Sequence, residues 1–221
     1  MTGVAVSRRR LHEHVMVAVL ARILGGEFGE GDLLPKETDL ASAHGVSRGV
    51  ARESILALQD RGVVTVRHGV GASVASQHQW QLFDPTLLEA LLNSPVARDA
   101  VRELLECREV LWPEIAAIAA QRRTSEDVTR LAAAVEDHEA FEMALLDASR
   151  NRFLRRALTS SHRALQAVNL ESGQDRPWRE AVLEAVSRGD VGSAREASRS
   201  GALAARPYSA MRRPAPPGRA R

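Results

Sequence analysis

Two arginines, Arg48 and Arg52, stand four residues apart in the stretch SRGVARESILALQDRG, which runs from Ser47 to Gly62. Four residues make about one turn of an α-helix, so the two guanidinium groups would point to the same side. A planar guanidinium can donate two parallel hydrogen bonds to guanine O6 and N7, or to phosphate oxygens. Gly49 has no side chain between them, which would let the helix approach bases closely. The spacing predicts a helix start that binds DNA.

A second group of cations follows a short distance along the chain. Arg67 and His68 lie in the run RHGVG, between the strand-like runs VVTV and ASV, and this pattern is typical of a β-hairpin. Cations at its tip would lie near the DNA backbone or the minor groove. An alternative interpretation is a solvent-exposed helix face without a binding role, on which the opposite charges of Arg52 and Glu53 are adjacent. The turn, helix and hairpin signals occur in the order that DNA binding requires, which favours the DNA-binding hypothesis.

The residues around these cations predict the elements that position them. Apolar residues at every fourth position from Leu11 to Ile23 indicate an amphipathic helix, and a short second helix is expected from Glu37 to His44. Gly45 and Val46 would then form a tight turn. Ser47 is a favourable N-cap for the helix that carries the two arginines, and the amides of that helix start also favour a phosphate. Helix, helix, turn, helix and hairpin together predict a winged helix-turn-helix.

The composition is that of a globular protein with helical cores. The chain has 221 residues, of which 44% are hydrophobic, 26% charged and only 4% aromatic, so Leu, Val, Ile and Ala must build the cores. No apolar run approaches the ~18 residues of a membrane span, and the N-terminal residues lack the apolar segment of a secretory signal. The single cysteine, Cys107, excludes an internal disulfide and fits a reducing cytoplasm. Residues 1–80 carry nine Lys/Arg and eight Asp/Glu, which is compatible with DNA binding if the cations share one face.

The stretch from Leu11 to Val74 resembles the winged-helix domain of GntR-type bacterial transcription regulators almost end to end. The motifs that carry the resemblance are GDLLPKETDLA, GVSRGVARESILAL and, at the hairpin, HGVG. The resemblance implies DNA contacts by Ser47, Arg48, Gly49, Arg52, His68 and Gly69. The family usually has a DNA-contacting arginine at the place of Thr38, and the nearby Lys36 could supply that missing charge. We expect Lys36, Thr38 and Arg67 to belong to the DNA-binding surface as well.

The remainder of the chain predicts a second, all-helical domain. We expect a DNA-binding domain at residues 1–76, a linker at 77–85, a helical domain at 86–205 and a disordered basic tail at 206–221. Pro113 should kink or split the second helix of the helical domain. The expected helices are Thr86–Leu92, Arg98–Arg122, Ser125–Ala148, Asn151–Leu170, Trp178–Arg188 and Val191–Ala205. The predicted fold class is mainly α, with an N-terminal winged helix-turn-helix and a C-terminal antiparallel helical bundle.

Three stretches of this region, RELLECREVLWPEIAAIAA, FEMALLDASRNRFL and AVLEAVSRGDVGSAREA, resemble the C-terminal domain of the fatty-acid-regulator-like branch of the same family. The resemblance implies a domain that dimerises and encloses a small effector, frequently a carboxylate held by a metal ion. The metal ligands in that branch are an Asp and a His four residues apart, followed by two later histidines. At these places this sequence has His138, Glu142, Arg179 and Gly201.

These residue types argue against a metal. His138 and Glu142 share a helix face and could hold a divalent ion weakly, but Arg179 would repel it and Gly201 offers no ligand atom. We expect no metal and no other cofactor. The alternative for His138 and Glu142 is a solvated or mutually hydrogen-bonded pair. Arg179, together with Arg108, could instead bind an anionic effector directly. A reduced pocket, or none, also stays open because this domain is shorter than usual.

The sequence shows no cluster that indicates an enzyme. Its seven histidines form no spaced cluster with Cys107 or a serine, and no nucleophile elbow or P-loop is present. We predict a transcription regulator, a repressor released by a small acidic metabolite. It would act as a homodimer on a pseudo-palindromic double-stranded DNA operator, in the cytoplasm at the nucleoid and without membrane contact. The alternative is a ligand-independent regulator or architectural protein whose helical domain only dimerises.

Overall fold

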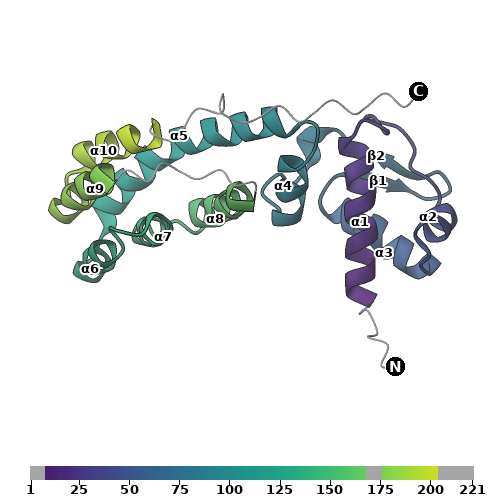
Figure 1. Cartoon of the computed structure of the whole chain (residues 1–221), viewed down its shortest axis with the longest axis horizontal. Coiled ribbons are helices and arrows are strands. Elements are labelled where there is room, and N and C mark those ends of the chain that lie inside the picture. Colours follow the sequence, from purple (N-terminus) through teal and green to yellow (C-terminus); the bar gives the residue numbers. More distant parts are fainter. Residues whose placement is uncertain (1–7, 168–175, 204–221) are drawn as a thin grey trace, which may run out of the picture. The chain divides into compact units, whose positions relative to one another are not determined.

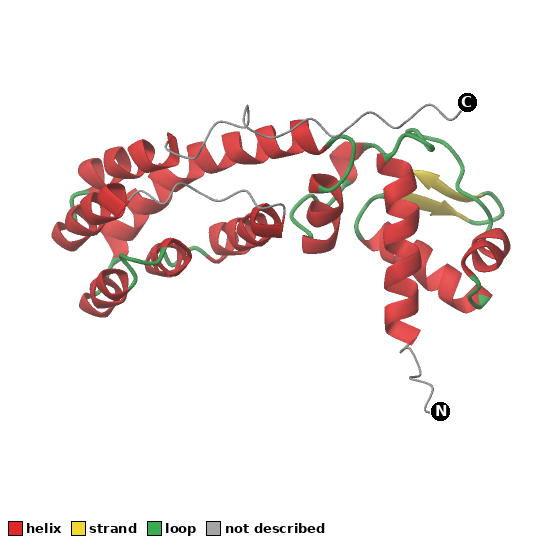
Figure 2. Ribbon diagram, in the orientation of Figure 1, coloured by secondary structure: helices red, strands yellow, loops and turns green. Residues whose placement is uncertain are grey.

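The computed structural model describes residues 8–167 and 176–203, and most of these residues are helical (Figures 1 and 2). The chain divides into two compact units, one of residues 1–100 and 160–168 and the other of residues 101–159 and 169–221. The N-terminal elements are α1 (Arg8–Leu24), α2 (Glu37–His44), α3 (Arg48–Asp60), β1 (Val64–Arg67), β2 (Gly71–Val74), a 3-10 turn η1 (Gln77–Gln79) and α4 (Pro85–Leu92). The following helices are α5 (Ala97–Arg122), α6 (Ser125–Ala133), α7 (His138–Ala148), α8 (Arg152–Ala167), α9 (Arg176–Arg188) and α10 (Val191–Leu203).

Two local signals build the turn between α2 and α3. Gly45 ends α2 in the left-handed conformation, with φ 62°, which glycine adopts at little cost. Ser47 has an extended backbone, and its hydroxyl accepts a hydrogen bond from the Val50 N–H at 3.3 Å, which makes it the N-cap of α3. The chain therefore passes from one helix to the next as the sequence predicts, and the winged helix-turn-helix is confirmed.

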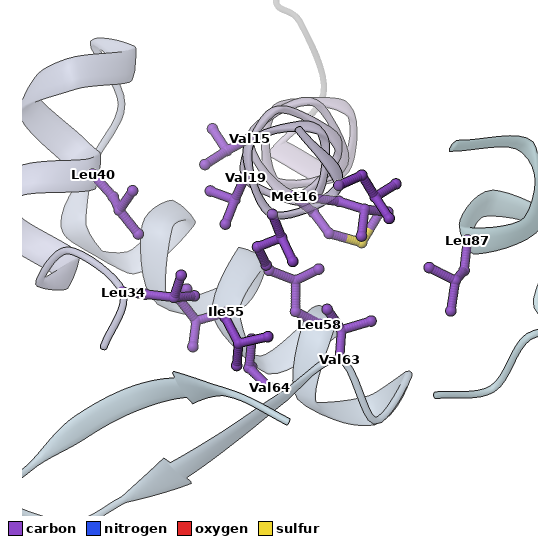
Figure 3. Close-up of a cluster of buried hydrophobic side chains, with 14 of the residues drawn as sticks. Val15, Met16, Val19, Leu34, Leu40, Ile55, Leu58, Val63, Val64 and Leu87 are labelled. Carbon is purple, nitrogen blue, oxygen red and sulfur yellow. The ribbon is translucent and has the colours of Figure 1, made fainter. Parts of the chain in front are cut away.

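The core of the N-terminal unit is mainly aliphatic (Figure 3). Val15 and Val19 of α1 are fully buried, and the same cluster holds Leu40 of α2 with Ile55 and Leu58 of α3. Burial of one such side chain stabilises a fold by about 1.5–3 kcal/mol. One face of α3 is fixed in this way, and its opposite face is left exposed.

The hairpin has the predicted antiparallel pairing, with Val64 of β1 opposite Val74 of β2. Strand β2 also pairs on its other side, where the Leu34 N–H donates to the Ala72 oxygen at 2.8 Å and the Val74 N–H donates to the Asp32 oxygen at 3.0 Å. The sequence indicated only a glycine-rich turn there. These bonds tie the hairpin to the segment that leads into α2.

The segment predicted as a linker is bound to the N-terminal unit. After η1, the Trp80 indole N–H donates to the Ala75 oxygen at 3.1 Å. The Gln81 N–H donates to the Arg61 oxygen at 2.9 Å, and the Arg61 Nε donates to the Asp84 carboxylate at 2.9 Å. The end of α3 is thereby joined to the residues that precede α4.

Gly62 makes this close approach possible. Its φ is 71°, and a Cβ on it would lie 2.1 Å from the Gln79 carbonyl oxygen, so a larger residue would push the segment away. Asp84 is the N-cap of helix α4, and its carboxylate accepts a hydrogen bond from the Leu87 N–H at 3.0 Å. Leu87 and Leu91 lie in the N-terminal core, whereas the sequence placed this helix at the start of the helical domain.

Helix α5 runs without interruption from Ala97 to Arg122. Of the two predicted effects of Pro113, the split is wrong, and the kink stays a prediction. Trp112, Ile115 and Ala116 on both sides of the proline are buried in the second core, and their packing outweighs the ~3 kcal/mol cost of a proline inside a helix.

The single helix predicted from Ser125 to Ala148 is also wrong, because α6 ends at Ala133 and α7 begins at His138. The Asp137 carboxylate accepts a hydrogen bond from the Ala140 N–H at 3.0 Å and so caps a new helix. Aspartate competes for backbone N–H groups and favours helix starts over helix interiors. The apolar periodicity alone did not reveal this break.

The second unit is a bundle of helices, which confirms the predicted fold class. Helices α9 and α10 form an antiparallel pair joined by Gly189 and Asp190, and the shared core includes Phe141 and Val182. The expected helix ends at Leu170 and Ala205, and the predicted disordered tail at 206–221, lie outside the described residues. None of the described helices has both the length and the apolar character that a membrane crossing requires.

Candidate nucleic-acid interface and effector site

Four of the predicted DNA contacts lie together at the start of α3. Ser47, Arg48, Gly49 and Arg52 are all exposed, while the next apolar residues of the helix are buried. Within the described part of the chain, Arg52 makes no hydrogen bond or ion pair. The free N–H groups and the positive end of the helix dipole favour an anion at this helix start. The arrangement suits the approach of a DNA phosphate and a base edge.

Arg48 differs from Arg52 because it has an acidic partner. Its Nε donates to Oε2 of Glu37, the first residue of α2, at 3.4 Å. The Arg48 side chain is still 74% exposed, so its outer nitrogens face solvent. The sequence analysis did not identify Glu37. An acidic residue at the start of α2, the helix before the one that carries Arg48, could have indicated a partner for that arginine.

Lys36 and Thr38 flank this glutamate, and both are exposed. Lys36 occupies the N-cap position of α2 without a capping bond from its side chain. The Thr38 hydroxyl donates to the Asp39 carboxylate at 3.3 Å. The geometry allows both residues to reach DNA, and their role there stays a prediction.

The hairpin tip presents the other predicted contacts. Arg67 is the last residue of β1, and His68 and Gly69 lie in the turn that follows. All three are exposed, as is Val70, which is 62% exposed. The tip therefore combines one permanent cation with one titratable group and a small apolar side chain.

In the second unit, three of the four predicted effector residues lie together, with Arg108 and Glu142 buried and His138 partly buried. The Arg108 Nη2 lies 2.7 Å and 3.0 Å from the two Glu142 carboxylate oxygens, and the two side chains are 7% and 4% exposed. The His138 Nε2 lies 3.3 Å from the same carboxylate. Glu142 therefore compensates the charge of Arg108, and Arg108 is not the bare cation that the sequence analysis expected to meet an anionic effector.

The fourth predicted effector residue is Arg179 of α9, which is buried and has only part of its hydrogen-bonding capacity used. Its Nε donates to the Val135 oxygen at 2.7 Å, between α6 and α7. Its Nη1 is buried and has no hydrogen-bond partner among the described residues. A buried polar group without a partner costs about 1–3 kcal/mol, and more when it is charged. An anionic ligand would remove this cost.

Two tryptophans that the sequence analysis passed over lie beside these residues. The Trp178 ring packs edge-on against the rings of His138 and Phe141, with centroids 5.8 Å and 5.7 Å away. The Arg108 guanidinium lies over the Trp112 ring, 5.3 Å from its centroid. Both indole N–H groups are buried and lack an acceptor in the described part of the protein. Tryptophan in a chain with only 4% aromatic residues was a signal that could have led to them.

The described residues provide little for a metal ion. In residues 8–167 and 176–203, no three His, Cys, Asp or Glu side chains lie close enough together to hold one. His138 and Glu142 are near each other, but Arg108 contacts the Glu142 carboxylate that a metal would need. The expectation of no cofactor stays a prediction, now with a physical reason in the Arg108 contact.

Comparison with known proteins gives a family match in the N-terminal part of the chain. The family described as "Bacterial regulatory proteins, gntR family" matches residues 11–74. An uncharacterised HTH-type transcriptional regulator of Mycobacterium tuberculosis is 40% identical over 129 residues, which are 58% of this chain and 52% of that protein. The HTH-type transcriptional regulator LutR of Bacillus subtilis is 34% identical over 147 residues, 60% of this chain and 65% of LutR. The galactonate operon transcriptional repressor of Escherichia coli is 27% identical over 139 residues, 60% of this chain and 61% of the repressor.

These matches span only about half to two thirds of the relatives' own lengths. Among solved structures, the Listeria monocytogenes protein Lar, which controls expression of the agr system, superposes with a TM-score of 0.53 at 19% identity, over 91% of this chain and 95% of Lar. At that identity the likeness concerns the fold alone. The named relatives are regulators of transcription and not enzymes, in agreement with the prediction from the sequence.

Proposed function

Because residues 11–74 belong to the GntR family of bacterial regulatory proteins, we propose that this chain is a transcriptional regulator that binds a double-stranded DNA operator. It acts as a repressor in the cytoplasm, at the nucleoid, and a small acidic molecule bound in the helical unit modulates its binding. It works as a homodimer, so that two recognition helices meet two half-sites.

The observation that carries the DNA-binding part is the setting of α3. Its buried face is fixed by the N-terminal core, its start is capped by Ser47, and Arg48 and Arg52 are exposed one turn apart. The hairpin tip supplies Arg67 and His68 as further exposed groups. Such a helix start fits the major groove, with the hairpin beside it on the backbone or in the minor groove.

Selection from a random duplex library tests this part with the full chain. We expect recovered sequences to share two half-sites related by dyad symmetry. Light scattering should give twice the chain mass of 24.1 kDa at micromolar concentration. Failure to enrich any sequence at moderate salt would contradict the proposal, and a monomer with non-symmetric sites would contradict the dimer.

The effector part rests on unmatched buried donors. The Arg179 Nη1 and the indole N–H groups of Trp112 and Trp178 all need acceptors. Arg108 and Glu142 compensate each other's charge, whereas the Arg179 guanidinium contacts a backbone oxygen. A small carboxylate would supply acceptor oxygens and the missing negative charge at the same time.

A panel of small carboxylic acids, titrated against the complex of the full chain with its selected duplex, tests this part. At least one acid should change the affinity for DNA, and Arg179→Ala should blunt the response. Arg188→Ala is the matched control, because Arg188 lies on the same helix and is exposed beside Glu184. An equal response of the Arg179→Ala protein would overturn this role.

One observation favours a second candidate function, a regulator that needs no ligand. The Arg108–Glu142 pair is complete without any small molecule, so the helical unit would then only join two chains. DNA binding that no acid in the panel affects, with a dimer in solution, would support this candidate.

A further inference from the structure

The contact between Glu37 of α2 and Arg48 of α3 supports an inference that goes beyond the proposed function. We propose that Glu37 is a positioning residue that presents Arg48 to a single guanine, and that it sharpens sequence preference at that base pair. This inference rests on the proposed DNA binding. Among the exposed arginines of the DNA-binding surface, Arg48 is held by a carboxylate, whereas Arg52 has no such contact within the described residues.

The chemistry follows from the edges of the guanidinium. A guanidinium has two edges with paired donors, one formed by Nε and a terminal nitrogen and one formed by the two terminal nitrogens. Glu37 Oε2 accepts from Nε of Arg48 at 3.4 Å. The edge with the two terminal nitrogens is thereby left to meet guanine O6 and N7.

Glu37 is itself well placed for this role. It is the first residue of α2, where the helix dipole favours a negative charge. Its side chain is 33% exposed, against 74% for Arg48, so the carboxylate is the more buried member of the pair. A long side chain held by a fixed neighbour loses less conformational freedom when it binds.

A carboxylate at a DNA surface also carries a cost, because phosphates repel it. Removing Glu37 should therefore have two opposite effects. Binding to DNA of any sequence should become stronger or stay unchanged, while discrimination at one base pair should fall. A residue with only a structural role would not separate these two quantities.

Duplexes recovered by the full-length wild-type chain from a random library provide the probe. Arg48→Ala identifies the base pair that Arg48 reads, at which the wild type should discriminate by roughly 5- to 150-fold. Glu37→Ala should reduce that discrimination at least fivefold. Glu37→Gln, which retains an acceptor oxygen, should preserve most of it. In the Arg48→Ala background, Glu37→Ala should change discrimination no further.

Asp39→Ala is the matched control. This substitution removes the same charge from the first turn of α2, but the Asp39 carboxylate contacts Thr38 and not Arg48. It should change the overall affinity without changing discrimination at the Arg48 base pair. Unchanged discrimination in Glu37→Ala would overturn the proposal, as would a loss at a different base pair, which would mean that Glu37 reads a cytosine directly. If the wild type enriches no sequence at all, the DNA-binding function itself fails.

Discussion

The arginines of α3 and the arginines of the helical unit are the same chemical group in opposite settings. Arg48 and Arg52 are exposed on a helix start whose other face is buried. Arg108 and Arg179 are themselves buried, and they contact Glu142 and a backbone oxygen respectively. An exposed cation can exchange solvent for a phosphate or a base, whereas a buried cation needs an acceptor for the fold to be stable.

This difference separates what a substitution should affect. Loss of an exposed arginine should weaken DNA binding and leave stability nearly unchanged. Loss of Arg108 should destabilise the protein, because it leaves the buried Glu142 carboxylate without its cation. The following substitutions test this separation.

The largest effect is expected for Arg108→Met. It leaves the Glu142 carboxylate, 4% exposed, without its cation, which should lower the free energy of unfolding by about 3–5 kcal/mol. The double variant Arg108→Met/Glu142→Leu should recover most of the loss, since an apolar pair can replace a buried ion pair. Urea unfolding measures both. A single variant as stable as the wild type would contradict the role of this pair.

A smaller loss is expected for Asp127→Asn. Burial raises the pKa of this carboxyl, but hydrogen bonds from the Thr124 N–H and hydroxyl, and then from Arg130 and Arg150, lower it well below its ordinary value. The charged hydrogen bonds should contribute about 1.5–3 kcal/mol.

The pH dependence of this contribution has a definite sign. Because the folded-state pKa of Asp127 is lowered, its stabilisation is fully present above the unfolded pKa of about 3.9 and is lost as the pH falls below that value. Urea unfolding at pH 7 and at pH values down to 3 should show the wild type approaching the variant in acid. A constant difference across this range would argue against the charge of Asp127, and exposed Asp60→Asn serves as the control.

The substitution Lys36→Ala should have a still smaller effect, on DNA binding alone. An exposed phosphate contact should be lost equally for all sequences, and the slope of log affinity against log salt should fall in magnitude by about one. Stability should not change, since the Lys36 side chain makes no capping bond. An unchanged salt slope in filter or anisotropy titrations would remove Lys36 from the DNA surface.

No effect is expected from metal removal. A cation near Arg179 would be repelled by about 4 kcal/mol at ~4 Å for an effective dielectric near 20, and Glu142 is engaged with Arg108. Thermal unfolding should be the same with and without a chelator. One equivalent of zinc by elemental analysis, lost in His138→Ala, would contradict this expectation.

The N-terminal unit was largely predictable because its signals are local. The turn at Gly45, the cap at Ser47 and the hairpin around RHGVG each act within a few residues. The contact between Glu37 and Arg48 was missed because it joins residues eleven apart on two helices. The pairing of β2 with Asp32 and Leu34 was missed for the same reason.

The helical unit was less predictable because apolar periodicity, helix capping and core packing favour different helix boundaries there. Apolar periodicity continued across Asp137, where a capping side chain ends it, and core packing kept α5 intact at Pro113. The sequence placed His138 and Glu142 on one face, but it could not show that Arg108, thirty-four residues earlier, contacts Glu142. Pairing of buried charges depends on tertiary contacts that no local pattern reveals.

The most direct test of the central claim compares one exposed arginine of each unit. Binding of the selected duplex by the full-length wild type, Arg52→Ala and Arg188→Ala would be measured by anisotropy over a range of salt concentrations. Both side chains are exposed, and Arg188 lies beside Glu184 on α9. We expect Arg52→Ala to weaken binding roughly 5- to 150-fold, with Arg188→Ala unchanged within about twofold. Equal affinities of the three proteins, or equal weakening by both substitutions, would contradict the assignment of DNA binding to the start of α3.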